Sequence, residues 1–171
     1  MYMATQALAD LSRRLERYAP QSLLAIGPRA ADWLAPFREA HPSCSITHLD
    51  AEGALSGEAL LNALSSYERF DFALIHGVLE RLEVEGGAHL MARLRDVNAR
   101  RFAVVVDAGD AARRWHTSDL IAMGLELWSS STLEETRVEV YGYDVGTYKV
   151  TPDWLNPRYW AHPEHWGKFR W

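Results

Sequence analysis

The stretch "SLLAIGPRAADWL", residues 22 to 34, has the pattern of a buried strand, a tight turn and the start of a helix. Its apolar run is short and continuous, which is typical of a strand buried on both faces of a parallel sheet. Gly27 supplies the turn. A helical stripe then follows, formed by Ala30, Trp33, Leu34 and Phe37. The stretch therefore predicts one β–α unit with a loop at the carboxyl end of its strand.

The same alternation recurs along the chain. Leu8, Leu11, Leu15 and Tyr18 predict a first helix, and the further strands are predicted at "CSITHLD", "FDFALIHG" and "RFAVVVDAG". Helices are expected over "SGEALLNALSSY", over a stripe of Leu90, Met91, Leu94 and Val97, and at about 117 to 124. "LELWSSS" and "RVEVYGYDVGTYKV" alternate with a period of two and predict an antiparallel hairpin. The pattern predicts an α/β, Rossmann-like three-layer sandwich with a mostly parallel sheet and a C-terminal hairpin.

Composition bounds the class of protein. The chain has 171 residues, is 48% hydrophobic and 24% charged, and has a net charge of -5, which is ordinary for one globular domain and argues against a nucleic-acid partner. Cys44 is the only cysteine, so an internal disulfide or a cysteine-built metal site is excluded. No run approaches the roughly 18 apolar residues of a membrane span, and the charged N-terminus lacks a signal-peptide core. A cytoplasmic, reduced setting is expected, without membrane contact.

The end of the chain differs from the rest. Residues 1–150 are predicted to form the α/β domain, and residues 151–171 an aromatic tail packed on the same domain. Six rings alternate there with three cations, namely Trp154, Tyr159, Trp160, Trp166, Phe169 and Trp171 with Arg158, Lys168 and Arg170. Such a pattern can stack nucleobases or sugars, but in an acidic chain it favours rings that anchor the tail on an apolar face. "HPEH" at 162–165 lacks helical metal spacing because of Pro163, and no metal is expected.

One long stretch carries a family likeness. "ERFDFALIHGVLERLEVEGGAHLMARLRDV", residues 68 to 97, resembles the fourth strand and following helix of class I S-adenosylmethionine-dependent methyltransferases, and "MGLELWSSS" resembles their entry into the last hairpin. The likeness spans about residues 5 to 150. The whole chain also resembles a small group of uncharacterised bacterial proteins. The resemblance implies S-adenosylmethionine as cofactor and methyl transfer as the reaction.

The first loop differs from the corresponding loop of the methyltransferase family. There it reads acidic-x-Gly-x-Gly-x-Gly, and its glycines let the backbone approach the methionine part of the cofactor. Here Ala25 stands at the acidic position, Gly27 is kept, and Pro28 and Arg29 replace the rest. Pro28 fixes its φ angle and lacks a backbone N–H donor. The chain is also shortened by about one strand–helix unit, because only about twenty residues separate "THLD" from "FDFAL". We therefore expect weak or undetectable S-adenosylmethionine affinity.

The resemblance and the strand ends together define the candidate cofactor residues. Ligands of open α/β sheets bind outside the carboxyl ends of the strands. Asp50 follows Gly27 by 23 residues, as does the acidic residue that bonds ribose hydroxyls in this fold, although Asp50 also suits an N-cap. Arg29 at a helix start suits a carboxylate or phosphate. The predicted cofactor-binding residues are Gly27, Arg29, Asp50, His76 and Gly77.

His76 and Asp107 are the candidate catalytic residues. A histidine at the end of the third strand suits a general base or a hydrogen-bond donor. The alternative is a structural histidine. Glu80, four residues on, is placed to orient it if the segment is helical, and the alternative is a solvated carboxylate. Asp107 and Asp110 flank Gly109 after the fourth strand, where they suit a substrate amine, but the same sequence is typical of a strand-to-turn exit.

Two functions follow from these residues. The first is a small S-adenosylmethionine-dependent methyltransferase of unknown acceptor, with lost or altered cofactor binding. The alternative is a non-catalytic protein of the same fold that acts as a binding or interaction module, with a small molecule or a protein as its partner. The sequence leaves the oligomeric state open.

Overall fold

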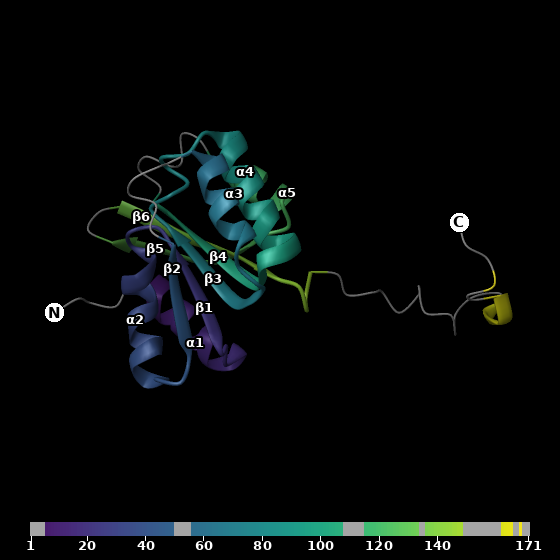
Figure 1. Ribbon diagram of the computed structural model, residues 1–171, viewed down its shortest axis with the longest axis horizontal. Coiled ribbons are helices and arrows are strands. Elements are labelled where there is room, and N and C mark those ends of the chain that lie inside the picture. The colour runs from purple at the N-terminus through teal and green to yellow at the C-terminus, as the bar shows by residue number, and fades with distance from the viewer. Residues whose placement is uncertain are drawn as a thin grey trace.

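The computed structural model describes residues 6–49, 56–107, 115–133, 136–148, 162–165 and 168. Six strands form one sheet in the order β2-β1-β3-β4-β6-β5 (Figure 1). The bounds are β1 Ser22–Ile26, β2 Ser45–Leu49, β3 Phe70–His76, β4 Ala99–Asp107, β5 Glu126–Leu133 and β6 Thr136–Asp144. The first four strands pair in parallel, and β6 pairs antiparallel with both β4 and β5. The predicted mostly parallel sheet with a terminal hairpin is confirmed.

Helices cover both faces of the sheet, which confirms the predicted three layers. The helices α1 (Gln6–Tyr18) and α2 (Ala30–Ala40) lie on one face, and α3 (Gly57–Ser65), α4 (Val84–Arg93) and α5 (Thr117–Ala122) lie on the other (Figure 1). A short 3₁₀ helix, η5, spans Pro163–His165. The residues between β2 and β3 that the structure describes, 56–69, contain one helix, α3, as the short separation in the sequence predicts.

Alternate residues of each central strand enter two separate cores. In β1, Leu23 and Ala25 pack with α1 and α2, whereas Leu24 and Ile26 pack with α3 and α4. All four side chains are at most 1% exposed. This double burial explains why β1, β3 and β4 are nearly continuous apolar runs in the sequence. It also leaves the polar residues of these strands at their ends, where a site can form.

One helical prediction was wrong in its last turn. Val97 was expected to face the core with Leu94, but it is 45% exposed, and Asn98 is fully buried instead. The reason is that α4 continues into a π-helical turn, η1, over Leu94–Asn98. A π turn holds one more residue than an α turn, so the inward position passes to the next residue in the chain.

Asn98 joins three elements through its side chain. Its Nδ2 donates hydrogen bonds to the carbonyl oxygens of Leu64 and Tyr67, at 3.1 and 2.9 Å, and its Oδ1 accepts one from Arg93 Nε at 2.9 Å. The residue therefore fixes the end of α3 against the start of β4.

We expect Asn98→Ala to lower the free energy of unfolding by about 2 to 3 kcal/mol, because buried groups that lose their partners keep the full cost of desolvation. Urea denaturation measures this loss. The matched control is Asn62→Ala, because Asn62 is exposed on α3 and its replacement should stay within about 0.5 kcal/mol of wild type. Equal losses in the two variants would contradict the role given to Asn98.

Candidate functional site

The carboxyl ends of β1, β3 and β4 meet at one edge of the sheet. Gly27 and Arg29 follow β1, His76 ends β3 and Gly77 follows it, and Asp107 ends β4. Because these strands are adjacent and parallel, the structure places these five predicted residues at one edge. Asp50 and Asp110, the other predicted residues, lie outside the described residues.

The loop after β1 packs directly on the loop after β3. Gly27 has a φ of +98°, and a Cβ added there would stand 2.4 Å from both the His76 carbonyl oxygen and Val78 Cγ2. A Cβ on Gly77 would lie 3.5 Å from the ring of Pro28. The side chain that replaces a family glycine thus fills the space beside the β3 exit.

Arg29 joins the β1 loop to the end of β4 through an ion pair with Asp107. Its Nη1 donates a hydrogen bond to Asp107 Oδ2 at 2.7 Å, and the two side chains are 61% and 25% exposed. Two predicted site residues, 78 positions apart in the chain, are therefore each other's partners. Arg29 also stands at the N-cap of α2, where no side chain caps the helix.

His76 is buried beside α2 without a hydrogen bond. Its side chain is 3% exposed, and its ring meets the Trp33 ring edge-on with centroids 4.9 Å apart. Neither ring nitrogen has a partner among the described residues. Burial lowers the pKa of His76 to about 4, against the charges of Asp107 and Asp32, which raise it. The ring is therefore neutral at pH 7 but weakly basic, which favours a hydrogen-bonding role over that of a general base.

Glu80 does not orient His76, contrary to the expectation from their spacing. Residues 77–83 form turns rather than a helix, so a separation of four residues does not bring the two side chains together. Both carboxylate oxygens of Glu80 are shielded from solvent. Burial raises the pKa of Glu80, and the charge of Asp107 adds to this rise, while nearby backbone N–H groups and Arg29 oppose it.

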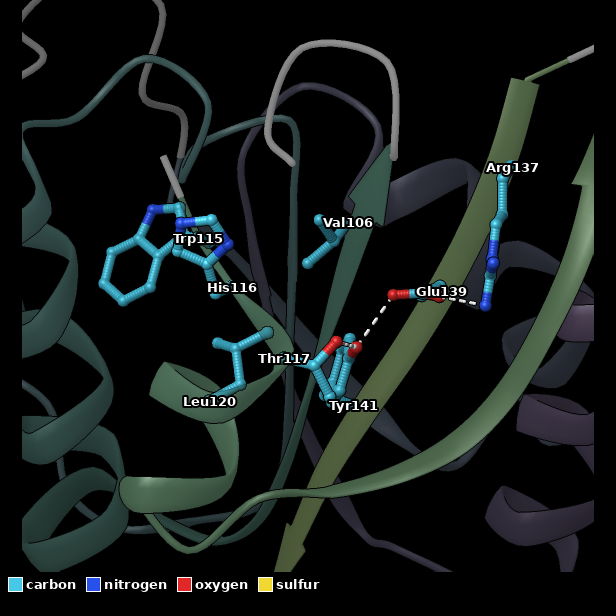
Figure 2. A pocket seen from close by; sticks show the side chains of 8 residues that line it. All are labelled: Val106, Trp115, His116, Thr117, Leu120, Arg137, Glu139 and Tyr141. Carbon is cyan, nitrogen blue, oxygen red and sulfur yellow. Dashed lines mark hydrogen bonds and ion pairs between the residues drawn. The ribbon is translucent and has the colours of Figure 1, made fainter. Parts of the chain in front are cut away.

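A cavity of about 270 Å³ lies on the other side of β4, between β6 and the start of α5 (Figure 2). Its lining comprises Val106, Trp115, His116, Thr117, Leu120, Arg137, Glu139 and Tyr141. A chain of polar contacts runs along its wall. Thr117 Oγ1 and Tyr141 Oη are 2.9 Å apart, Tyr141 Oη donates to Glu139 at 2.7 Å, and Glu139 pairs with Arg137 at 2.7 Å. Burial raises the pKa of Tyr141, and the Glu139 contact adds to the rise.

The residues of this cavity are not among those predicted from the sequence. Arg137, Glu139 and Tyr141 alternate along β6 and therefore share the face that packs against α5. The sequence did contain one indication of this site: Glu139 and Tyr141 stand two residues apart in a predicted strand, so their side chains share one face of the sheet. The contribution of Thr117 from α5 has no counterpart in the sequence pattern, because it depends on where the helix lies on the sheet.

Sheet order, layers and the position of the site at the carboxyl edge together define a protein of the methyltransferase-like Rossmann fold. The chain belongs to a family of unknown function, DUF6231, which it matches over residues 3–171. No curated protein matches it.

Two solved proteins illustrate the fold. The pyocyanin biosynthetic protein PhzM has a TM-score of 0.52 and 19% identity over 80% of this chain, which spans only 54% of PhzM. Magnesium protoporphyrin IX methyltransferase ChlM from Synechocystis PCC 6803, solved with bound S-adenosylhomocysteine, has a TM-score of 0.54 and 13% identity over 80% of each chain. It was also solved with bound S-adenosylmethionine. At these identities the likeness concerns the fold.

The described residues do not fit S-adenosylmethionine in the position that the family resemblance implies. The glycine loop should leave room for the methionine part of the cofactor, but Pro28 packs at Gly77 and the Arg29 guanidinium spans to Asp107. Within the described residues, no group of three or more His, Cys, Asp and Glu side chains is placed to hold a metal ion. No helix among them is long and apolar enough to cross a membrane.

Proposed function

We propose that this chain is a small-molecule-binding protein built on the methyltransferase fold, in which the usual S-adenosylmethionine position is closed. The observation that carries the proposal is the contact of the first loop with the exits of β3 and β4, through Pro28 at Gly77 and Arg29 at Asp107. What supports a ligand is the pair of His76 ring nitrogens, which have no partner among the described residues, together with the cavity beside β6. Such sites are the usual ligand-binding positions of an open α/β sheet.

A second candidate is a methyltransferase of unknown acceptor that holds S-adenosylmethionine in an altered pose. The observation that favours it is the position of His76 at the strand end where the family resemblance expects a functional group. Its imidazole is buried and neutral, and neither ring nitrogen has a partner in the described part of the chain. The ion pair of Arg29 with Asp107 is no strong barrier, because a pair this exposed contributes about 0 to 1 kcal/mol. The backbone contact at Gly27 and the Pro28 ring are the greater obstacles.

Calorimetric titration with S-adenosylmethionine and S-adenosylhomocysteine separates the two candidates. We expect no binding by the wild type up to millimolar ligand, and measurable binding by the double variant Pro28→Gly, Arg29→Gly, because it removes the ring and the guanidinium from the loop. Arg29→Lys is the matched control, because it keeps a cation and leaves Pro28 in place. Micromolar binding by the wild type that Asp50→Ala abolishes would overturn the proposal in favour of the methyltransferase.

A further inference from the structure

The cavity beside β6 has a polar side and an apolar side (Figure 2). The polar side consists of Thr117 on α5 with Glu139 and Tyr141 on β6, and the apolar side of Val106, Leu120 and Trp115. The other two described lining residues, His116 and Arg137, are exposed. A volume of about 270 Å³ lies just below the usual range of ligand pockets, which begins at about 300 Å³. The cavity therefore suits a ligand of about one ring.

The hydroxyl proton of Tyr141 belongs to its contact with Glu139. Tyr141 Oη donates a hydrogen bond to Glu139 Oε2 at 2.7 Å, and the second carboxylate oxygen, Oε1, lies 2.7 Å from Arg137 Nη2. A carboxylate in an ion pair has no proton and can only accept, so the tyrosine must donate. Burial raises the pKa of Tyr141, although the Thr117 contact opposes this rise, so the hydroxyl keeps its proton at neutral pH.

Thr117 is therefore the donor in its contact with Tyr141. Thr117 Oγ1 and Tyr141 Oη are 2.9 Å apart, and each hydroxyl has a single proton. Since the Tyr141 proton points to Glu139, the Thr117 proton points to Tyr141. Both hydroxyl protons are used within the polar side, and these two oxygens offer lone pairs to the cavity. A ligand that bonds to them must be a hydrogen-bond donor.

The charges of the polar side favour a neutral donor. The Glu139 carboxylate already has a guanidinium and a hydroxyl as partners, and its side chain is 15% exposed. An anionic ligand would bring a second negative charge beside it. An ammonium ligand would have to leave water for an anion that Arg137 already balances, and a buried charge without its own counter-ion is costly. A hydroxyl group donates without either cost.

The apolar side is held firmly in place. Trp115 Nε1 donates a hydrogen bond to the Leu79 carbonyl oxygen at 3.4 Å, so the polar atom of the indole has its partner. A Cβ added to Gly87 would stand 2.5 Å from Trp115 Cζ2, which shows how closely α4 packs on this ring. Beside it, Val106 and Leu120 are at most 3% exposed. The ring of a ligand would therefore meet a fixed hydrocarbon surface.

We propose that this cavity binds a neutral ring compound whose hydroxyl group donates a hydrogen bond to the Thr117–Tyr141 pair, with the ring against Val106, Leu120 and Trp115. The inference rests on the proposed ligand-binding function and names the class of its ligand. The described lining comes from β4, β6, α5 and the two residues before α5, so binding does not depend on the loop after β1.

The experiment is a ¹H–¹⁵N NMR titration of the full chain at pH 7 with phenol, which is neutral there because its pKa is near that of tyrosine, about 10. Anisole is the matched ligand control, because its methyl group removes the hydroxyl proton. We expect millimolar binding of phenol, with the largest shifts at residues 115–120 and 137–141. Anisole should bind about threefold to tenfold more weakly, as the loss of one neutral hydrogen bond requires. Benzoate, which carries a negative charge, should not bind.

Thr117→Val removes the accepting hydroxyl with little change of shape. It should weaken phenol binding about threefold to tenfold and leave anisole binding unchanged. Tyr141→Phe releases the Thr117 proton for a ligand oxygen, so the preference for phenol over anisole should fall at least about threefold. Thr132→Val is the matched protein control, because Thr132 is exposed on β5 and does not line the cavity.

Absence of phenol binding, equal binding of phenol and anisole by the wild type, or equal effects of Thr117→Val and Thr132→Val would each overturn the inference. Titration with S-adenosylhomocysteine separates this failure from that of the proposed function. If neither phenol nor S-adenosylhomocysteine binds, only the assignment of the cavity ligand fails. If S-adenosylhomocysteine binds to the wild type, the proposed function fails, whatever the result with phenol.

Discussion

Gly27→Ala is expected to lower the free energy of unfolding by about 4 kcal/mol, which is a large share of the stability of an ordinary domain. Two terms add. A φ of +98° is a conformation that residues with a Cβ rarely adopt, at a cost of about 1 to 3 kcal/mol. The new Cβ would also stand 2.4 Å from the His76 carbonyl oxygen, which is backbone and cannot rotate away. Overpacking of this kind costs about 1 to 3 kcal/mol more.

Gly77→Ala is the matched control for this variant. Gly77 also has a positive φ, +77°, and stands at the same edge, but the nearest atom to its added Cβ is 3.5 Å away, an ordinary contact distance. It should therefore show the backbone cost of about 1 to 3 kcal/mol without the overpacking. Urea denaturation of both variants measures the difference. Equal losses would mean that the β1 and β3 exits are not in close contact, and the closed first loop would lose its main support.

The sequence predicted the sheet because its signals are local. A strand buried on both faces must be a continuous apolar run, and the runs at 22–26, 70–76 and 101–106 have this composition without reference to the rest of the chain. The π turn of η1 left no such signal. One extra residue in a turn changes no composition, and only the burial of a polar Asn98 beside an exposed Val97 records it.

The site was predicted less well, because its contacts are long-range. Gly27, Arg29, His76 and Asp107 were identified from their places at strand ends, and the parallel register brings them to one edge. The pairing of Arg29 with Asp107 joins residues 78 positions apart, and no local pattern encodes it. The expected contact of Glu80 with His76 assumed a helical spacing that the turns at 77–83 do not provide.

Pro28 and Arg29 both occupy the sheet edge after β1, but different contacts hold them there. Both residues fill the edge with parts of the chain itself, in place of the second and third glycines of the family loop. The Arg29 side chain is held by an exposed ion pair, whereas Gly27 contacts the His76 backbone and the Pro28 ring lies beside Gly77. The loop is thus closed to a cofactor that must lie over the glycines.

His76→Leu is expected to remove much of the acid sensitivity of the fold. In the folded state the pKa of His76 is about 4, below the ordinary value of 6.5 that applies to the unfolded chain. Between these values the unfolded chain binds the proton more tightly, so wild-type stability falls as pH decreases through this window. The shift corresponds to about 3 kcal/mol in full, and about 2 kcal/mol is already lost at pH 5. Leucine binds no proton, so the variant does not lose this part of the stability as pH decreases.

Urea denaturation of wild type and His76→Leu at pH 7, 6, 5 and 4 measures the difference in slope, since the other titrating groups are common to both. At pH 7 the variant should be as stable as wild type or more so. The buried imidazole has no hydrogen-bond partner among the residues that the structure describes, which costs free energy that an apolar side chain does not. His48→Leu, on the exposed side of β2, controls for loss of an imidazole as such. Parallel slopes for wild type and His76→Leu would mean that His76 is hydrated in the folded state. A steeper wild-type slope would mean that the fold keeps a dry, neutral imidazole beside Trp33 at a cost in stability, which packing alone does not explain.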